Sequence, residues 1–318
     1  MAEPSSQTHR GPERDFVGYG PTPPDPQWPG GADVVINVVV NFEEGGEFNV
    51  LDDGANDSWG EYETNFPPEH RDLGTESHFE FGSRVGIWRL AHLFEELDVP
   101  FTVAACGRAL ERNPAFATWL GESDSDILGH GYRWEGGDSP GAPISRAAEA
   151  GQMDNGIEAI TRMTGKAPEG WMVRSFPSVH TRELVAERGG LLYDSDSYND
   201  ELPYYVECLG RPFLVLPYTQ VYNDTRYFLA PTYAVPRHFV ENLRAALDTL
   251  LAESREPGTG KMMSIGLHSR WSGQHSRTWA VREFLTEAKR LPNVSFMRRA
   301  DIARHWLAVH PPPDPASA

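Results

Sequence analysis

Acidic and imidazole side chains follow several apolar segments that have the composition of buried strands. Glu43 and Glu44 come directly after the β-branched segment 34–42, and His130 and His268 each follow a shorter apolar segment. A carboxylate can take a proton from water and imidazole titrates near neutral pH, so these residues suit hydrolysis by general acid–base catalysis. Each residue alone also has a structural explanation, as part of a solvated turn or as a hydrogen-bonded histidine. The prediction of a site depends on their coincidence at strand ends.

Cationic and aromatic residues follow the same segments. Arg133 and Trp134 come shortly after His130, Arg174 follows the segment 170–173, and Trp271 comes shortly after His268. A guanidinium group is a preorganised donor for an oxyanion or a carbonyl oxygen, and an indole ring packs against a planar ring. These side chains therefore predict a substrate-binding wall beside the acid–base groups.

The elements that must position these residues alternate between strands and helices. This alternation predicts one α/β domain with a parallel sheet, and a closed barrel and an open doubly wound sheet both fit it. No G-x-G-x-x-G follows the first strand, which argues against the dinucleotide-binding fold. In a barrel, the site lies at the carboxyl ends of the strands. We expect strands at 34–42, 101–105, 126–129, 170–173, 191–193, 213–216, 262–267 and 294–297, and helices at 84–97, 114–120, 144–163, 181–188, 237–253, 277–289 and 300–308.

The chain divides into three segments. Residues 1–31 are rich in proline and predict an extended arm, residues 32–310 form the barrel, and residues 311–318 form a tail. Residues 48–78 are expected to form a long loop with many acidic and aromatic residues. A loop of this length often serves as a lid or a subunit contact. Its aromatic residues are Trp59, Tyr62 and Phe66.

Composition limits the classes of partner. The 318 residues include 28 basic and 46 acidic side chains, a formal net charge of −18 that repels nucleic acids and anionic membranes. The polar beginning of the chain lacks the apolar core of a signal peptide, and no apolar segment is long enough to cross a bilayer. The two cysteines, Cys106 and Cys208, lie among apolar residues and suggest buried free thiols. We expect a soluble cytoplasmic protein that acts on a small molecule.

Taken in chain order, the motifs resemble those of the polysaccharide deacetylases of the NodB-homology type. Residues 42–45 (Phe-Glu-Glu-Gly) stand where that family has paired aspartates, and residues 129–134 stand at its His-x-x-x-His motif. Residues 174–177 look like its arginine–proline motif, and Leu267-His268 looks like its closing Leu-x-His motif. Longer motifs resemble a subgroup, the metal-independent allantoinases and related cyclic imide hydrolases. They lie at 14–20, 28–30, 41–47, 82–89 and 193–204.

The resemblance implies a distorted (β/α) barrel with an N-terminal arm, hydrolysis of a cyclic amide C–N bond, and a homotetramer. By position Glu43 would be the general base, and Glu44 and His130 would stand at metal-ligand positions. Trp134 replaces the second histidine, and an indole N–H only donates, so it cannot bind zinc. We therefore expect catalysis without a metal ion; if one is bound, Glu44 and His130 hold it, with His78 or His275 as a further ligand.

The expected mechanism gives each residue a role. A glutamate whose pKa is raised by aromatic shielding takes the proton of the attacking water, and either of the paired glutamates fits. His130 orients the water, His268 protonates the departing nitrogen, and Arg174 or Arg133 holds the oxyanion. Trp134 and Trp271 pack against the ring.

Two alternatives remain open on the sequence. One is a zinc-dependent or other metal-dependent N-deacetylase of an N-acetylated sugar or related amide, and the other is a ligand-binding protein without activity. Residues 135–138 and 269–277 depart from the subgroup near the predicted mouth of the barrel, so the substrate ring stays unassigned.

Overall fold

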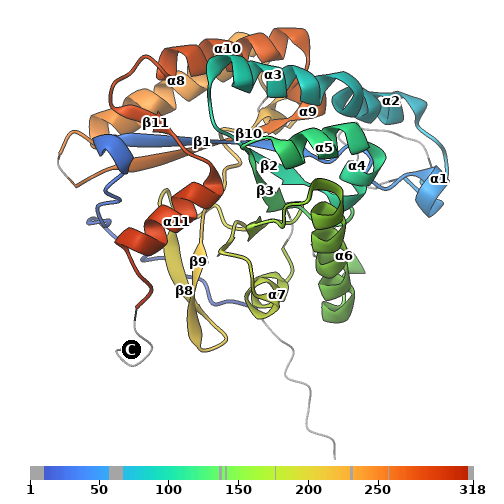
Figure 1. The fold of residues 1–318 in the computed structure, drawn as a ribbon, viewed down its shortest axis with the longest axis horizontal. Helices are drawn as coiled ribbons and strands as arrows, with labels where there is room; N and C mark the ends of the chain where they lie inside the picture. Colours follow the sequence, from blue (N-terminus) through green and yellow to red (C-terminus); the bar gives the residue numbers. More distant parts are fainter. Residues whose placement is uncertain are drawn as a thin grey trace, which may run out of the picture.

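The protein is described by a computed structural model (Figure 1). The structure describes residues 11–56, 67–135, 138–139, 142–175, 177–229, 232–256 and 258–313. Within these residues no helix has the length and apolar character needed to cross a membrane. Cys106 and Cys208 are both free and buried, as the sequence predicts.

A nine-stranded sheet forms the centre of the fold. Its order is β10-β1-β2-β3-β6-β7-β9-β8, with β11 pairing with the beginning of β1, and every pair is parallel except β8–β9. The strands are β1 (Val34–Phe42), β2 (Thr102–Ala105), β3 (Asp126–Gly129), β6 (Gly170–Trp171), β7 (Tyr193–Asp194), β8 (Tyr204–Cys208), β9 (Arg211–Val215), β10 (Lys261–His268) and β11 (Val294–Phe296). A separate antiparallel pair joins β4 (Asp138–Ser139) to β5 (Ala142–Pro143).

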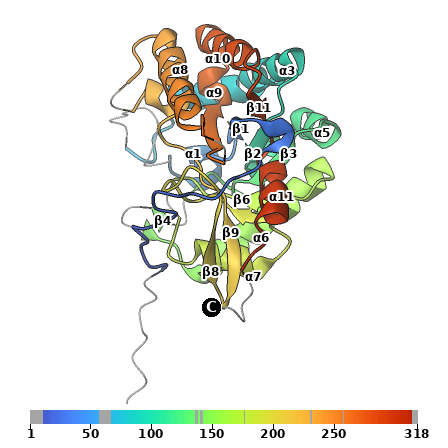
Figure 2. The ribbon, with the colours of Figure 1, turned by 90° about the vertical axis from the view of Figure 1, so that its left-hand side faces the viewer.

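Helices cover the outside of the curved sheet. The helices α3, α8 and α10 lie side by side over β1 and β10, and α4, α5 and α6 form a second group (Figures 1 and 2). The helices are α1 (Val50–Asp53), α2 (Leu73–Phe81), α3 (Ile87–Leu97), α4 (Gly107–Arg112), α5 (Pro114–Glu122), α6 (Arg146–Thr164), α7 (Thr181–Arg188), α8 (Pro236–Glu253), α9 (Ser269–Ser272), α10 (His275–Ala288) and α11 (Arg299–Val309).

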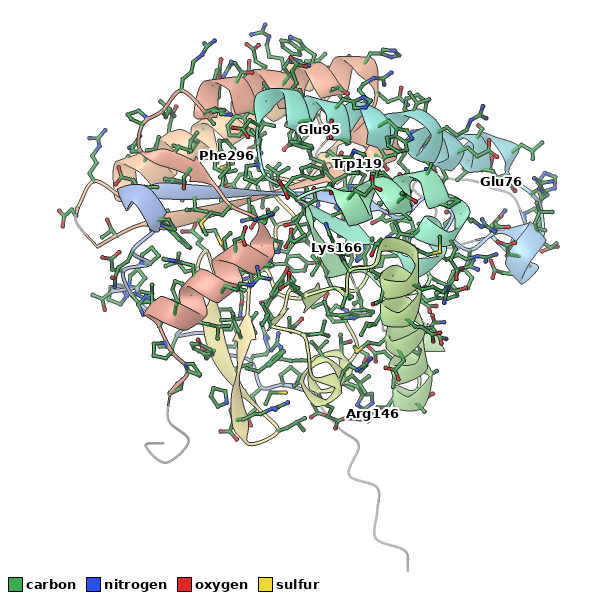
Figure 3. All side chains as sticks on the ribbon, viewed as in Figure 1. Glu76, Glu95, Trp119, Arg146, Lys166 and Phe296 are labelled. Atoms are coloured by element: carbon green, nitrogen blue, oxygen red, sulfur yellow. The ribbon has the colours of Figure 1, made fainter. Side chains whose placement is uncertain are left out.

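The core lies between the sheet and these helices. All nine residues of β1 are buried, as expected for a strand covered on both faces. Stacked aromatic rings fill the space between α3 and α5, and Trp119 Nε1 donates to Glu95 at 3.2 Å across that contact (Figure 3).

The barrel is closed by a narrow seam. The segment after β9 meets β10 through one parallel bridge, between Asn223 and Gly266. Arg299 lies fully buried inside the barrel and spans this gap. Its guanidinium donates to Asn37 Oδ1 at 2.9 Å and to the carbonyl oxygens of Leu216 and Pro217. The expected distorted barrel is therefore confirmed.

Some elements differ from the expectation. The helix predicted at 84–97 begins earlier, because α2 and α3 run on through a π-helical turn at Gly82–Gly86. The predicted loop 48–78 contains α1 and the beginning of α2, and its aromatic residues Trp59, Tyr62 and Phe66 lie outside the described residues. The sequence did not predict β8, which pairs with β9 in the antiparallel direction and is a half-exposed strand without a buried apolar pattern.

Candidate active site

Three parallel strands of the sheet bring the predicted acid–base residues together. Glu43 follows β1, His130 follows β3, and His268 ends β10, and all three side chains are buried. The parallel register places Asn41 of β1 beside His268 of β10. Parallel strands present their carboxyl ends at the same edge of the sheet, so side chains far apart in sequence share one site.

Glu43 is the centre of this cluster. Its Oε1 lies 3.1 Å from His130 Nε2 and 3.5 Å from His268 Nε2, and its Oε2 lies 2.7 Å from a guanidinium nitrogen of Arg270. Burial alone would raise the pKa of Glu43, but Arg270 and the two histidines hold that pKa well below its usual range. The expectation of a raised pKa was wrong for Glu43 because the sequence did not reveal its cationic neighbours.

His268 is held by a second carboxylate. Its Nδ1 lies 2.7 Å from Asp224 Oδ1, and its backbone N–H donates to Asp224 Oδ2 at 2.8 Å. Ser272 also donates to Oδ2, from its hydroxyl and its backbone N–H. Burial would lower the pKa of His268, but Glu43 and Asp224 raise it to about 10. The residue is therefore an imidazolium at neutral pH and has a proton to give.

The position of His130 constrains the protons of the cluster. Its Nδ1 lies 2.9 Å from the carbonyl oxygen of Met172, which only accepts, so Nδ1 carries a hydrogen. Its Nε2 lies 3.1 Å from Glu43 Oε1. His130 thus fixes the direction of that carboxylate.

Glu44 points away from the cavity and binds Arg270. Its Oε1 accepts from the backbone N–H of Arg270 at 3.1 Å and lies 3.3 Å from its guanidinium, while Oε2 accepts from the backbone N–H of Glu43. Burial raises the pKa of Glu44. Gly82 in the π-helical turn makes room for this carboxylate, because a Cβ there would lie 2.7 Å from its Cδ.

Arg270 is a buried cation between both glutamates. Its side chain is fully buried, and its Cζ lies 4.6 Å from the ring centroid of Phe79 and 4.9 Å from that of Trp134. The aromatic faces and the two carboxylates together stabilise the charge. The sequence motifs assigned Arg270 no role, and its position two residues after His268 was the only signal.

A cavity of about 310 Å³ opens onto Glu43, His130 and His268. Its wall combines polar and aromatic side chains from several strand ends. Besides the three cluster residues, these include Asn41, Trp134, Arg174, Ser175, Tyr198, Tyr218, Gln220, Asn223 and Phe228. Arg174 lies over the ring of Trp134, with its Cζ 3.6 Å from the centroid.

Two residues predicted to bind substrate do not line this cavity. Arg133 donates to the carbonyl oxygens of Gly46 and Glu47 and pairs with Asp53 at 2.5 Å, so it holds the segment after β1. Trp271 stacks on Phe228 with ring centroids 4.9 Å apart and supports the wall from behind. Both side chains have structural roles in this geometry.

Asp224, Asn41 and Tyr218 complete the site, and the sequence analysis assigned none of them a role. Asn41 lies near the end of the buried strand β1, two residues before Glu43, so the alternation of side chains continued from β1 was a usable signal. Asp224 and Tyr218 lie in or near the irregular segment after β9, where no periodicity identifies them.

Comparisons with known proteins agree with this geometry. No protein-family model matches the chain. A Schizosaccharomyces pombe protein that bears a polysaccharide deacetylase name is 33% identical over 319 residues, covering 94% of this chain and 98% of its own length. The chain belongs to the polysaccharide deacetylase family.

Two solved structures are similar to this chain in fold as well as in sequence. The crystal structure of Puue allantoinase has a TM-score of 0.87 and 40% identity, covering 94% of this chain and 98% of that chain. A structure from Pseudomonas aeruginosa PAO1, which bears a polysaccharide deacetylase name, has a TM-score of 0.87 and 39% identity over 94% of this chain and 99% of that chain. The family comprises hydrolases that act on C–N bonds.

The described residues around Glu43 and Glu44 do not fit a divalent metal ion. Trp134 offers no lone pair to a metal, and the guanidinium of Arg270 already lies beside both glutamates. His78 packs against Trp271, and His275 lies 3.3 Å from Arg89 on the outer surface. Across the described ranges, no three His, Cys, Asp or Glu side chains group closely enough to hold a metal ion, whereas catalytic zinc usually has three protein ligands.

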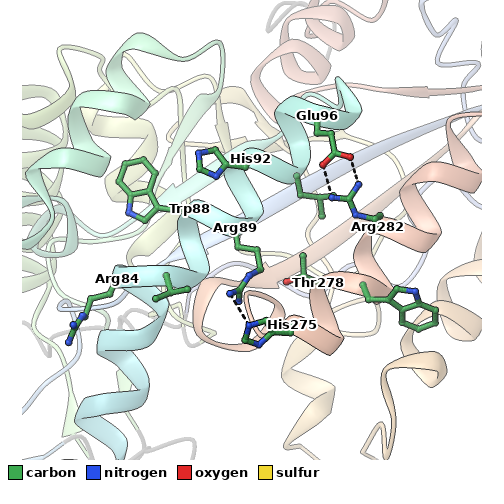
Figure 4. A pocket seen from close by; sticks show the side chains of 11 residues that line it. Arg84, Trp88, Arg89, His92, Glu96, His275, Thr278 and Arg282 are labelled. Carbon is green, nitrogen blue, oxygen red and sulfur yellow. Dashed lines mark hydrogen bonds and ion pairs between the residues drawn. The ribbon is translucent and has the colours of Figure 1, made fainter.

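A second hollow, of about 610 Å³, lies outside the barrel between α3 and α10 (Figure 4). It contains Trp88, His275 and an ion pair in which the two terminal guanidinium nitrogens of Arg282 contact Glu96. This groove contains no buried acid–base cluster. The cavity at the strand ends is therefore the candidate active site.

Proposed function

We propose that the chain opens the ring of a small cyclic amide by hydrolysing a C–N bond, without a bound metal ion. One observation carries the proposal: a cavity that ends on a carboxylate and two imidazoles, where Arg270 supplies the positive charge beside the paired glutamates. The 40% identity to Puue allantoinase supports a cyclic substrate such as allantoin, a hydantoin or a cyclic imide. The volume, about 310 Å³, is near the lower end of ligand pockets and suits a single ring.

The mechanism uses Glu43 as base and His268 as acid. The water oxygen attacks the carbonyl carbon while Glu43 takes one water proton. His268 then gives its Nε2 proton to the ring nitrogen as the C–N bond breaks, and Asp224 holds the imidazole through Nδ1. Once His268 is neutral, one of the cations that lower the pKa of Glu43 is gone, and the proton can return from Glu43 to His268 across their 3.5 Å contact. The product is a linear amide with a new carboxyl group, which ionises.

Arg174 and Trp134 bind the ring in this proposal. Trp134 lines the cavity and packs beneath Arg174, so its indole and the guanidinium form a rigid polar wall. The guanidinium donates to a carbonyl oxygen of the ring that does not react.

The names of the yeast and Pseudomonas relatives favour a second candidate, removal of an acetyl group from an acyclic amide. The same acid–base pair would serve it, since both reactions hydrolyse an amide C–N bond. The two differ in substrate.

The decisive experiment measures turnover on a panel containing allantoin, hydantoin, succinimide and an N-acetylglucosamine oligomer, before and after exhaustive chelation. We expect ring opening that survives chelation, and a loss on the order of 10²-fold or more in Glu43→Gln. Glu96→Gln, an exposed change in the outer groove, serves as the matched control. Turnover of the oligomer alone would favour the second candidate, and activity that needs added zinc would contradict the metal-free mechanism. The expected homotetramer is also a proposal, which light scattering tests.

A further inference from the structure

Tyr218 lines the cavity on the segment that closes the barrel. Its phenol oxygen lies 3.0 Å from Asn41 Nδ2 and 3.4 Å from Asn223 Nδ2. The hydrogen-bond network fixes the orientation of both amides. Asn41 Nδ2 also lies 3.0 Å from the carbonyl oxygen of Leu267, and Asn223 Oδ1 accepts from the backbone N–H of Thr225 at 3.0 Å. Both amides therefore donate to the phenol oxygen.

This arrangement leaves the phenol proton without a protein acceptor. A tyrosine hydroxyl has one proton to donate and two lone pairs to accept with, and the two amides occupy both lone pairs. In the part of the chain that the structure describes, no oxygen or nitrogen accepts a hydrogen bond from Tyr218. Burial raises the pKa of Tyr218 above its usual value, so the hydroxyl stays protonated at neutral pH. The remaining direction for the O–H bond is the cavity.

The hydroxyl is also held rigidly beside the acid–base groups. Gly266 of β10 makes room for it, because a Cβ there would overlap the phenol oxygen and lie 2.5 Å from Asn223 Nδ2. Asn41, which donates to the hydroxyl, is the register partner of His268. Below the ring, the Cζ of Arg299 lies 5.7 Å from its centroid. A donor fixed in this way pays no reorganisation energy when charge develops near it.

We propose that Tyr218 is a further catalytic residue, whose hydroxyl donates a hydrogen bond to the carbonyl oxygen of the scissile amide. It stabilises the negative charge that develops on this oxygen when water attacks. The inference rests on the proposed function and specifies the substrate atom that this part of the cavity recognises, a neutral carbonyl oxygen.

The test uses two variants that remove the same hydrogen bond in different ways. Tyr218→Phe deletes the hydroxyl, and Gly266→Ala keeps it but displaces it. We expect kcat/KM to fall on the order of 10²-fold in Tyr218→Phe, mainly through kcat, with an unchanged pH profile. Gly266→Ala should follow in the same direction. Tyr205→Phe is the matched control, because its hydroxyl donates to the carbonyl oxygen of His310 away from the cavity.

The outcomes separate this inference from the proposed function. An active wild type with Tyr218→Phe within threefold of it would overturn the role of Tyr218 and leave the hydrolase proposal intact. A wild type without turnover on any amide would overturn both. Circular dichroism and thermal unfolding show whether each variant is folded; if Gly266→Ala fails to fold, Tyr218→Phe decides.

Discussion

Replacing Asp224 by asparagine should move the pH range in which the enzyme works. The pKa of His268 is about 10 instead of 6.5, which corresponds to about 5 kcal/mol in favour of the imidazolium. The carboxylates of Glu43 and Asp224 both contribute, against the opposing effect of burial. Because burial opposes them, the two carboxylates together raise this pKa by more than the net difference. If they contribute equally, the neutral amide of Asp224→Asn lowers the pKa of His268 by at least about two units, to about 8 or below.

A general acid works only while it is protonated, so the alkaline limit of activity follows this pKa. In the wild type, kcat/KM should stay level up to about pH 9.5. In Asp224→Asn it should decline with a midpoint at about pH 8 or below. The assay is the pH dependence of kcat/KM between pH 6 and 9.5 on the best substrate of the panel, with spontaneous hydrolysis subtracted at each pH.

Ser272→Ala is the control for the geometry of the carboxylate. This variant removes one hydrogen bond to Asp224 Oδ2 but keeps the negative charge, so its alkaline limit should remain close to that of the wild type. An Asp224→Asn enzyme whose alkaline limit equals that of the wild type would refute the role of His268 as an acid stabilised by Asp224. A uniform fall at every pH would instead indicate a purely structural role for Asp224.

Three further predictions concern stability. Arg270→Met leaves two carboxylates buried without their cation and should lower the free energy of unfolding by about 3–5 kcal/mol in urea denaturation. The control Arg282→Met, at an exposed ion pair, should change this free energy by less than about 1 kcal/mol. Equal losses in the two variants would contradict the role of Arg270. Because the folded-state pKa of His268 lies above its unfolded value, its contribution to stability is complete below about pH 6.5 and is lost as the pH rises toward 10. The stability difference between wild type and His268→Gln should therefore shrink from pH 6 to pH 10, and a constant difference would argue against the charged state. Arg299→Met strands several buried acceptors at the seam and should cost about 3 kcal/mol or more of unfolding free energy; a loss below about 1 kcal/mol would show that the seam does not depend on Arg299.

The sequence predicted the strands and helices that have a regular apolar pattern. The buried strand β1 and the strand–helix alternation follow from apolar periodicity, and the ends of these strands identified Glu43, His130 and His268. Asp224 escaped prediction because it lies in an irregular segment, and its partnership with His268 depends on a contact across 44 positions.

The charges in the site were harder to predict than the positions of its residues. The pKa of Glu43 depends on Arg270, which lies more than two hundred residues away along the chain. Arg133 and Arg174 were indistinguishable in the sequence because both follow strands. Only the packing of Arg133 against the segment after β1 separates them. Antiparallel β8 was missed because it is half exposed and packs as part of a hairpin.

The seam of the barrel links the active site to local opening of the sheet. One bridge joins Asn223 to Gly266, whereas β1 and β10 pair along eight residues, so the seam should open locally at a lower free energy than the rest of the sheet. Asp224 and Tyr218 both lie on the segment that closes there. A brief opening would therefore remove the support of His268 and the phenol donor together while the remaining sheet stays folded. Amide hydrogen exchange at the seam would then report the fraction of molecules with a complete active site, a quantity to which global unfolding measurements are insensitive.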